Sequence, residues 1–373
     1  MKTVKCTIDS GSWESASARN WSDWMWQMRH RIHTIPQLAG ILGKSPENLG
    51  EFIEVSRRYP FCITPYYLSL MDLANMNDPL RLQCFPDARE IHFSLGGVED
   101  PLAENRDMPV PGLIHRYRDR CLTLVTNICT TYCRHCNRKR MWGHNGVTRN
   151  RLYLRRMIDY IEMTTGIREV IVSGGDPLTM EEETLEWFLK SLRSIPHVEV
   201  LRIGSRVPVV MPMRVTRFLC SMLRKYRPLW FNTQFNHPNE ITKESARACE
   251  MLLDAGIPVS NQSVLLRGIN DNYKTMRELL YGLQRISVRP YYLFQCDPVE
   301  GTDHFRADTG AGLRIMEKLW ENMPGLCIPQ YVLDVPGGRG KVPLFQLCSE
   351  SFSRKIFNSS CIMHSSKESY SDG

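Results

Sequence analysis

From about residue 120 onward, short apolar runs rich in β-branched residues alternate with segments of helical periodicity. A strand covered on both faces reads as a continuous apolar run, whereas a helix repeats its apolar residues every three or four positions. Most of the runs are separated by helical segments of about 12 to 16 residues, which is long enough for a crossover connection. Seven runs have this character: 121–126, 169–173, 198–203, 230–234, 259–264, 289–294 and 328–333. The alternation predicts an α/β fold with a parallel sheet and right-handed crossovers, consistent with a partial (β/α)6-type barrel.

Two helices in this region carry signals at their ends. Thr179 and Glu182 have the spacing of a capping box in front of an apolar helical pattern. The helix that contains Met251 is expected to end at Gly256, which Pro258 follows. These signals predict where two of the crossover helices begin and stop.

Composition divides the chain into three parts. Residues 1–110 are predicted to form an N-terminal helical region that ends in an acidic, proline-containing connector, 98–111. Residues 111–345 are expected to form the barrel with its cofactor-binding segments. Residues 346–373 are rich in Ser and Lys and are predicted to be a mobile tail.

Charge and hydropathy exclude several classes of protein. The net charge is +7, but the basic residues are scattered, so no nucleic-acid partner is expected. No apolar stretch is long enough for a membrane span, and no apolar segment follows the N-terminal Met1, so neither a membrane location nor a signal peptide is predicted. The expected location is cytoplasmic. Most of the 13 cysteines lie singly and are expected to be buried thiols.

Three cysteines are grouped directly after the first predicted parallel strand. Cys129, Cys133 and Cys136 have the spacing C-x3-C-x2-C. Thiolates are soft ligands that suit zinc or an iron–sulfur cluster. A structural zinc ion needs a fourth ligand, and only His135 lies nearby to supply one. Three thiolates in one loop favour a [4Fe–4S] cluster with one open iron.

The cysteine loop and the segments around it resemble a known family. A C-x3-C-x-aromatic-C loop after a first barrel strand, here with His135 in the aromatic position, is typical of radical S-adenosylmethionine (SAM) enzymes. The flanking sequence resembles the lysine 2,3-aminomutase family more specifically, over roughly residues 20–345. The matching segments are 125–128, 138–141, 173–178, 202–208, 235–240, 261–268 and 336–341. The resemblance implies a radical SAM barrel.

The resemblance also implies which residues hold SAM. The three cysteines would bind a [4Fe–4S] cluster, with SAM on the open iron. Glycines after a strand allow the backbone to approach a ligand closely. The implied SAM or cofactor contacts lie at successive strand ends: Gly174, Gly175, Asp176, Ser205, Arg206 and Gln262. An external reductant such as flavodoxin or ferredoxin is expected.

A second cofactor, pyridoxal phosphate (PLP), is implied near the C-terminal end of the barrel. Lys341 matches the family's PLP lysine, and a lysine amine forms a Schiff base with the cofactor aldehyde. A Walker A loop is rejected, because Val335 stands where its first glycine is needed and Val342 follows the lysine. Arg116, Tyr117 and Arg120 match residues near PLP, where guanidinium groups suit a phosphate.

Three residues bear on the substrate. Arg138 matches the arginine that binds the amino-acid carboxylate, and Asp297 and Asp334 match two acids that face the substrate side chain. Two carboxylates favour a cationic side chain, so the substrate is expected to be a basic amino acid. The implied reaction is conversion of L-lysine to β-lysine by 1,2-amino migration.

Three alternatives remain open on the sequence. The first is the same chemistry on arginine. The second is a short aminomutase that makes β-lysine for attachment to a translation factor. The third, from a different class, is a SAM-cluster protein without mutase activity.

The chain departs from the family in several places. The cysteines of a C-terminal zinc segment are missing except for Cys348 and Cys361, and the earlier zinc ligand is replaced by Asn272. No structural zinc is therefore predicted, and a homo-oligomer, if it forms, is not expected to assemble in the family's usual way. Phe294 stands where an aromatic hydroxyl is common, and Gln234 where histidine is common.

Overall fold

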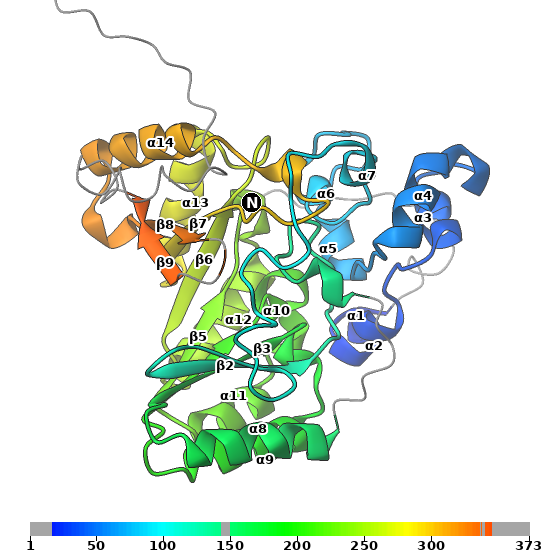
Figure 1. Cartoon of the computed structure of the whole chain (residues 1–373). Helices are drawn as coiled ribbons and strands as arrows, with labels where there is room; N and C mark the ends of the chain where they lie inside the picture. Colours follow the sequence, from blue (N-terminus) through cyan, green and yellow to red (C-terminus); the bar gives the residue numbers. More distant parts are fainter. Residues whose placement is uncertain (1–16, 143–149, 336, 338–339, 345–373) are drawn as a thin grey trace, which may run out of the picture.

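The computed structural model describes residues 17–142, 150–335, 337 and 340–344. One sheet of nine strands runs through the molecule in sequence order (Figure 1). Strands β2 to β8 are parallel, and the two edge strands β1 and β9 pair antiparallel with their neighbours. The strands are β1 (Leu113–Tyr117), β2 (Arg120–Thr126), β3 (Glu169–Gly174), β4 (Val200–Gly204), β5 (Leu229–Thr233), β6 (Val259–Leu265), β7 (Arg289–Gln295), β8 (Gln330–Val335) and β9 (Gly340–Pro343).

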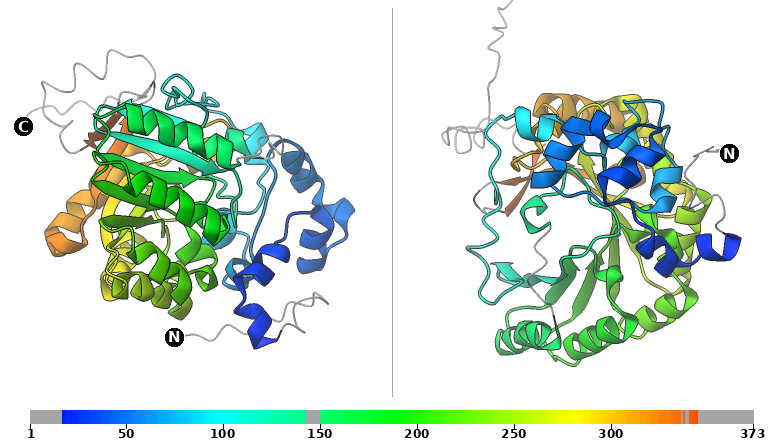
Figure 2. Two further views of the ribbon diagram at one scale, coloured as in Figure 1. Left: turned by 90° about the horizontal axis from the view of Figure 1, so that it is seen from below. Right: turned by 90° about the vertical axis from the view of Figure 1, so that its right-hand side faces the viewer.

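A long helix follows each of the first six parallel strands and packs on the outer face of the sheet (Figure 2). These helices are α8 (Arg151–Met163), α9 (Glu182–Arg193), α11 (Arg217–Arg224), α12 (Lys243–Asp254), α13 (Tyr273–Arg285) and α14 (Thr309–Asn322). Six βα units followed by a seventh parallel strand form an open barrel. The predicted partial (β/α)6-type barrel is therefore confirmed. Parallel strands of this kind place their carboxyl ends, and the loops that follow them, at one end of the barrel.

All seven predicted strands are present, and their ends lie within two residues of the expected positions. Strands β1 and β9 were not predicted. Each is an edge strand with one hydrogen-bonded neighbour, and neither Leu113–Tyr117 nor Gly340–Pro343 has a continuous apolar run. An edge strand of mixed polarity has no strong sequence signal, because only part of it is buried.

Of the two helix-end signals, one is confirmed and one is wrong. Gly256 follows the C-cap of α12 with a φ of +73°, a conformation that favours glycine and ends the helix. Thr179 does not cap α9, because it belongs to a short 3-10 helix, Pro177–Thr179, and the N-cap of α9 is Glu181. The Thr179 hydroxyl donates instead to the backbone oxygens of Asp176 and Ile128, which ties this turn to the cysteine loop.

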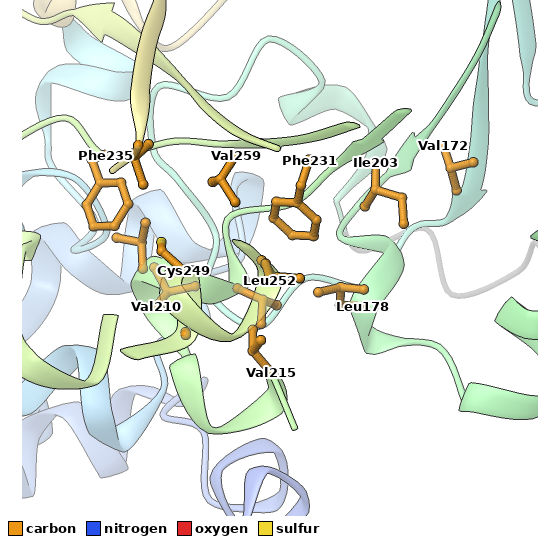
Figure 3. Packing of buried hydrophobic residues seen from close by; sticks show 14 of the residues in the cluster. Val172, Leu178, Ile203, Val210, Val215, Phe231, Phe235, Cys249, Leu252 and Val259 are labelled. Carbon is orange, nitrogen blue, oxygen red and sulfur yellow. The ribbon is translucent and has the colours of Figure 1, made fainter. Parts of the chain in front are cut away.

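The core lies between the sheet and its helices. Figure 3 shows Ile203, Phe231 and Val259, from neighbouring strands, in a row that faces Leu252 of α12 and Val215. All five side chains are buried. Burial of each such side chain contributes roughly 1.5–3 kcal/mol, so this layer fixes the positions of the strands and hence of the loops at their ends.

The N-terminal helical region lies beside the barrel and contacts the loops at its carboxyl end (Figure 1). Its helices are α1 (Ala18–Trp21), α2 (Trp24–Arg29), α3 (Ile35–Ile41), α4 (Gly50–Arg58), α5 (Pro65–Ser69), α6 (Pro79–Leu82) and α7 (Arg89–His92). At the boundary, the Tyr67 hydroxyl donates to Glu240 and the Thr64 hydroxyl donates to the Val210 carbonyl. The division at residue 110 stays a prediction, and the expected tail 346–373 lies outside the described residues.

None of the helices in the described ranges is long and apolar enough to cross a membrane.

A buried carboxylate joins the N-terminal region to the cysteine loop. Glu90 of α7 accepts hydrogen bonds from the Arg134 guanidinium, at 2.6 Å from Nη2, and forms an ion pair with Lys139. The three side chains are at most 1% exposed. Burial on its own would raise the pKa of Glu90, but the two cations hold it below its usual value. Each of these three buried charges depends on the others for its counter-ion. Separating the loop from α7 would therefore leave a buried charge without a counter-ion, which is strongly destabilising.

We expect Glu90→Gln to lower the free energy of unfolding by about 3 kcal/mol or more, because it leaves two buried cations without a counter-ion. The matched control is Asp159→Asn, which removes an exposed partner of Arg155 on α8 and is expected to change stability by less than about 1 kcal/mol. Urea titration with both variants measures the difference. Equal stability of Glu90→Gln and Asp159→Asn would contradict this account of the loop.

Candidate functional site

A cavity of about 670 Å³ lies inside the open barrel. Its walls are built from the interior of the sheet, the loops that follow the parallel strands, and strands β1 and β9. All of the residues predicted from the sequence to bind cluster, cofactor or substrate line this one cavity: Arg116, Tyr117, Arg120, Cys129, Cys133, Cys136, Arg138, Gly174, Gly175, Asp176, Ser205, Arg206, Gln262, Asp297, Asp334 and Lys341.

The cysteine loop follows β2 and is held in place by the N-terminal helical region. The Arg31 guanidinium donates to the Cys129 carbonyl at 2.7 Å, and the backbone NH of Arg134 donates to the Gln83 carbonyl at 2.8 Å. The three thiols are free and partly exposed to the cavity. Since backbone contacts fix the loop, the thiols are presented on a rigid frame.

The residues present fit an iron–sulfur cluster better than a single zinc ion. Among the described residues, no three His, Cys, Asp or Glu side chains converge on one metal position. His135 Nε2 lies 3.0 Å from the Gln234 amide and 3.3 Å from the Asn236 amide, so it faces amide donors rather than the thiols. Three soft thiols on one cavity wall match the three protein ligands of a [4Fe–4S] cluster that leaves one iron open.

The turn after β3 packs tightly against the start of the cysteine loop. A Cβ atom on Gly175 would lie 2.4 Å from the Ile128 carbonyl oxygen, and one on Gly174 would lie 2.3 Å from that of Thr126. Gly174 also has a φ of +134°, which favours glycine. The two glycines therefore allow the turn after β3 to lie against the start of the cysteine loop, in addition to any ligand contact predicted for them.

The Asp176 carboxylate faces protein donors. It accepts hydrogen bonds from the Ser205 hydroxyl, from the Arg206 backbone NH, both at 2.8 Å, and from the Leu178 backbone NH at 3.0 Å. Burial raises its pKa, while these hydrogen bonds oppose the shift. In this arrangement Asp176 connects the loops after β3 and β4.

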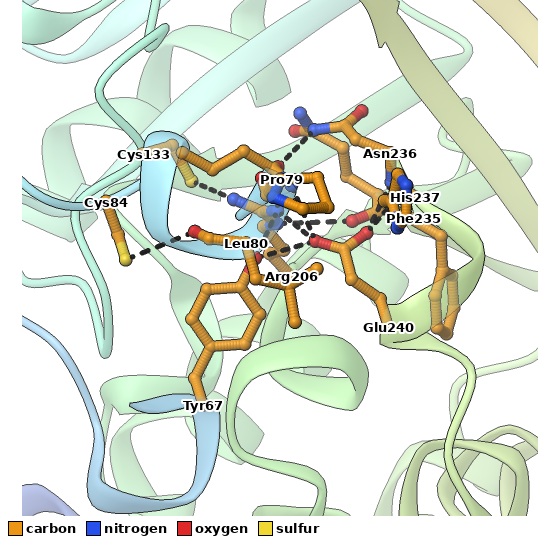
Figure 4. A network of polar contacts seen from close by, with 12 residues as sticks. Tyr67, Pro79, Leu80, Cys84, Cys133, Arg206, Phe235, Asn236, His237 and Glu240 are labelled. Atoms are coloured by element: carbon orange, nitrogen blue, oxygen red, sulfur yellow. Dashed lines mark hydrogen bonds and ion pairs between the residues drawn. The ribbon is translucent and has the colours of Figure 1, made fainter. Parts of the chain in front are cut away.

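The Arg206 guanidinium contacts one of the three thiols directly. Its Nη1 lies 2.7 Å from Cys133 Sγ, and its Nη2 donates to Glu240 at 2.7 Å and to the Gln83 side chain at 2.6 Å (Figure 4). Glu240 is fully buried and also accepts from the Tyr67 hydroxyl. The guanidinium is therefore held by Glu240 and Gln83 with one nitrogen against the thiol of the cysteine loop.

At the other end of the cavity, Lys341 meets Asp334 across the β8–β9 pair. Lys341 Nζ lies 3.0 Å from Asp334 Oδ2, and its backbone NH donates to the Tyr117 hydroxyl at 3.2 Å. The amine also lies 5.9 Å from the centre of the Tyr117 ring and 5.7 Å from that of Phe294. A partly exposed amine between two aromatic rings fits the binding of a flat aldehyde cofactor.

Two arginines stand beside this lysine. Arg116 Nη1 lies 3.3 Å from Asp334 Oδ1, and its Nε donates to Asp107 at 3.2 Å. The Arg120 guanidinium stacks 3.9 Å over the Tyr117 ring. Fixed guanidinium groups next to the lysine amine fit the phosphate of such a cofactor.

Asp297, in the loop after β7, stands apart from these paired groups. Its Oδ1 is buried and has no hydrogen-bond partner among the described residues. Burial, with the nearby Asp334 charge as the next cause, raises the pKa of Asp297 to about 7. A hydrogen bond with the Asn137 side chain opposes this shift. Because Oδ1 is buried without a partner in the described part of the chain, Asp297 is the group in this cavity that a cationic ligand would stabilise most.

Sequence reasoning missed Glu104. Arg138 donates to its carboxylate through Nη2 at 2.8 Å and Nε at 3.0 Å, and Arg140 donates at 2.8 Å. Burial opposes ionisation of Glu104, but Arg138 and Arg140 hold its pKa below the usual value. The composition of 98–111 predicts only a connector. Its acidic residues, together with the basic residues Arg138 and Arg140 later in the chain, are the one signal in the sequence for this pairing.

Comparison with known proteins agrees with this geometry. Residues 123–280 match the Radical SAM superfamily model. The chain is 50% identical over 328 residues to the L-lysine 2,3-aminomutase of Acetoanaerobium sticklandii, covering 88% of this chain and 79% of that protein. The corresponding enzyme of Clostridium subterminale is 48% identical over 331 residues, covering 89% and 80%. The glutamate 2,3-aminomutase of Clostridioides difficile is 42% identical over 330 residues, covering 88% and 78%.

Membership of the radical SAM superfamily implies a [4Fe–4S] cluster and SAM. The relatives are aminomutases, which are isomerases that move amino groups. The chain is therefore an isomerase that belongs to the lysine 2,3-aminomutase family of radical SAM enzymes.

Proposed function

We propose that this enzyme converts L-lysine to β-lysine by moving the α-amino group to the neighbouring carbon, with a [4Fe–4S] cluster, SAM and PLP as cofactors. The observation that carries the proposal is a pair of carboxylates, Asp297 and Asp334, on the wall of the cavity that also holds Arg138 and Lys341; Asp334 and the Oδ1 atom of Asp297 are buried. A cation at one end of the cavity and two acids elsewhere on its wall match an amino acid with a basic side chain.

The cofactors would be held by different walls of the cavity. Cys129, Cys133 and Cys136 would bind the cluster. The end of β3, the loops after β3 and β4, and strand β6 would hold SAM, with contacts at Gly174, Gly175, Asp176, Ser205, Arg206 and Gln262. Lys341 would carry PLP, with Tyr117 against its ring and Arg116 and Arg120 near its phosphate. When bound, the cluster and SAM supply a carbon radical, and PLP supplies a π system that delocalises the unpaired electron.

The chain's own side chains position the substrate and manage its charges. Arg138 orients the α-carboxylate through a charge-assisted hydrogen bond, and Asp297 accepts the side-chain ammonium. Asp334, 3.0 Å from Lys341 Nζ, would orient that amine toward the bound cofactor. Enclosure within the barrel limits the access of water to the reacting carbon atoms.

The acidic pair also bears on the competing substrates. The side chain of glutamate would place a second carboxylate beside Asp297, one oxygen of which already has no partner among the described residues. Two neighbouring carboxylates repel each other, so glutamate would bind less favourably than lysine. Arginine carries a cation that the two acids would also accept, so it is the closest rival. A protein without mutase activity is disfavoured by the presence of Lys341, Arg138 and both acids in one cavity.

Anaerobic turnover tests the proposed substrate. The protein, reconstituted with iron, sulfide, PLP and SAM and reduced with dithionite, is given lysine, arginine or glutamate separately, and β-amino acids are measured by mass spectrometry. We expect β-lysine, with lysine turned over at least tenfold faster than arginine and no product from glutamate. β-Arginine as the main product would show that arginine, not lysine, is the substrate. The absence of any β-amino acid would refute the proposed reaction.

A second prediction concerns PLP. Incubation with PLP followed by borohydride reduction should attach the cofactor covalently to Lys341, because reduction traps a Schiff base. Peptide mass mapping locates the label. Lys341→Ala should lose it, whereas Lys225→Ala, which removes an exposed lysine that does not line the cavity, should keep it. Labelling elsewhere in the unaltered protein would contradict the assignment of Lys341.

A third prediction concerns pH. In the free enzyme the raised pKa keeps Asp297 largely protonated below about pH 7, and a cation must displace that proton to bind. Asp297→Asn should raise KM for lysine about 10- to 100-fold at pH 8, the effect of losing a charged hydrogen bond. Below pH 7 this difference should shrink by up to about tenfold per pH unit.

Dividing the KM of the variant by that of the unaltered enzyme at each pH cancels titrations that both proteins share. Asp308→Asn, at an exposed helix cap, is the control and should leave KM unchanged at every pH. A ratio for Asp297→Asn that stays constant between pH 6 and 8 would show that Asp297 does not titrate against the substrate cation.

A further inference from the structure

The acidic connector before β1 contributes a side chain to the cavity. Glu104 lies on the cavity wall beside Arg138, although 34 residues separate them in the sequence. Its side chain is only 5% exposed, and its carboxylate oxygens receive hydrogen bonds from Arg138 and Arg140. Glu104 is therefore part of the site rather than of a solvated linker.

Backbone contacts on several sides hold the connector in place. Val98 exchanges hydrogen bonds with Pro298 and Glu300, in the loop that carries Asp297. The Pro101 carbonyl accepts from the Gly337 NH, between β8 and β9. Since its backbone is tied both to the loop that carries Asp297 and to Gly337, the segment holds Glu104 in place independently of Arg138.

The contact uses one edge of the Arg138 guanidinium. Nε and Nη2 both donate to Glu104, and Nη1 has no hydrogen-bond partner among the described residues. A guanidinium has two edges that can each form a paired contact with a carboxylate. With one edge occupied, the free Nη1 has a defined direction and a substrate carboxylate need not order the side chain.

We infer that Glu104 is a positioning residue that fixes Arg138 for the α-carboxylate of the amino-acid substrate. This inference rests on the proposed function, because it takes Arg138 as the carboxylate-binding group. Arg140, which shares the Glu104 carboxylate, offsets the negative charge placed beside Arg138. Glu104 acts on the substrate through Arg138 and does not contact the reacting atoms.

Charge alone predicts the opposite effect. Removing the negative charge of Glu104 leaves the surroundings of Arg138 more positive, and a substrate carboxylate would then bind more tightly. Positioning predicts weaker binding, because the guanidinium loses its fixed orientation. The direction of the change in Glu104→Gln therefore separates the two explanations.

The experiment measures equilibrium binding of L-lysine and L-lysinamide to the reconstituted enzyme without reductant, so that no turnover occurs. Lysinamide keeps the side-chain cation but lacks the carboxylate. In Glu104→Gln we expect the dissociation constant for lysine to rise about tenfold, the usual effect of losing one well-placed charged contact, and that for lysinamide to change less than about threefold. KM for lysine should rise with little change in kcat.

Two further variants control for folding. Glu104→Asp keeps the charge but shortens the reach, and should weaken lysine binding to an intermediate degree. Glu182→Gln alters a carboxylate that also pairs with a buried arginine, Arg214, but lines no part of the cavity, and should leave both ligands' binding unchanged.

Tighter or unchanged lysine binding in Glu104→Gln would overturn the inference, as would an equal loss of lysine and lysinamide binding. If the unaltered enzyme does not prefer lysine to lysinamide, the role proposed for Arg138 fails and the inference fails with it. If Glu104→Gln keeps the full preference for lysine over lysinamide, the role inferred for Glu104 is wrong, while the role proposed for Arg138 still stands.

Discussion

The buried Glu90 carboxylate, with Arg134 and Lys139 as its two cations, is the interaction on which the arrangement of the site depends. A loop that presents three thiols to a cluster must be rigid, yet it must leave one face open to the cavity. Loops rarely have enough apolar side chains to hold themselves in place, and buried polar groups must be paired. Here an ion cluster fixes the loop from its outer side, which leaves its inner face available.

The same device recurs around the cavity: a carboxylate from one segment meets an arginine from another. Glu240 holds Arg206 against Cys133, and Glu104 holds Arg138. Each pair joins parts of the chain that are distant in sequence. Such pairs add little net stability compared with apolar packing, but breaking one leaves a buried charge, so they specify position strongly. The hydrophobic sheet–helix layers supply stability, and the ion pairs set the geometry of the loops.

Within this compensated set, Asp297 is the exception. The arginines and the lysine of the cavity have acidic partners, while one oxygen of Asp297 has none among the described residues and its pKa is raised by burial and by the Asp334 charge. When the other acidic groups of the site are paired or hydrogen-bonded and one carboxylate oxygen has no partner, the site is best completed by a ligand that carries a cation. This imbalance connects the charge pattern of the cavity to the choice of a basic amino acid.

Much of this could be predicted from the sequence, because continuous apolar runs mark buried strands and the C-x3-C-x2-C spacing marks a loop of thiols. The residues that local motifs predict for the site all line one cavity. The partners of those residues could not be predicted: Asp334 lies 218 positions from Arg116, and no local pattern links them. The edge strands β1 and β9 could not be predicted for a related reason. Their strand conformation depends on pairing with a neighbouring strand rather than on their own composition.

The central claim is that one cavity holds an amino acid with its carboxylate at Arg138 and its side-chain cation at Asp297. A crystal structure of the anaerobically reconstituted enzyme with SAM, PLP and lysine tests it most directly. The account predicts lysine joined to the cofactor beside Lys341, with its carboxylate within hydrogen-bond distance of Arg138 and its ammonium within hydrogen-bond distance of Asp297. Lysine bound in the reverse direction, or with its ammonium away from Asp297, would contradict it.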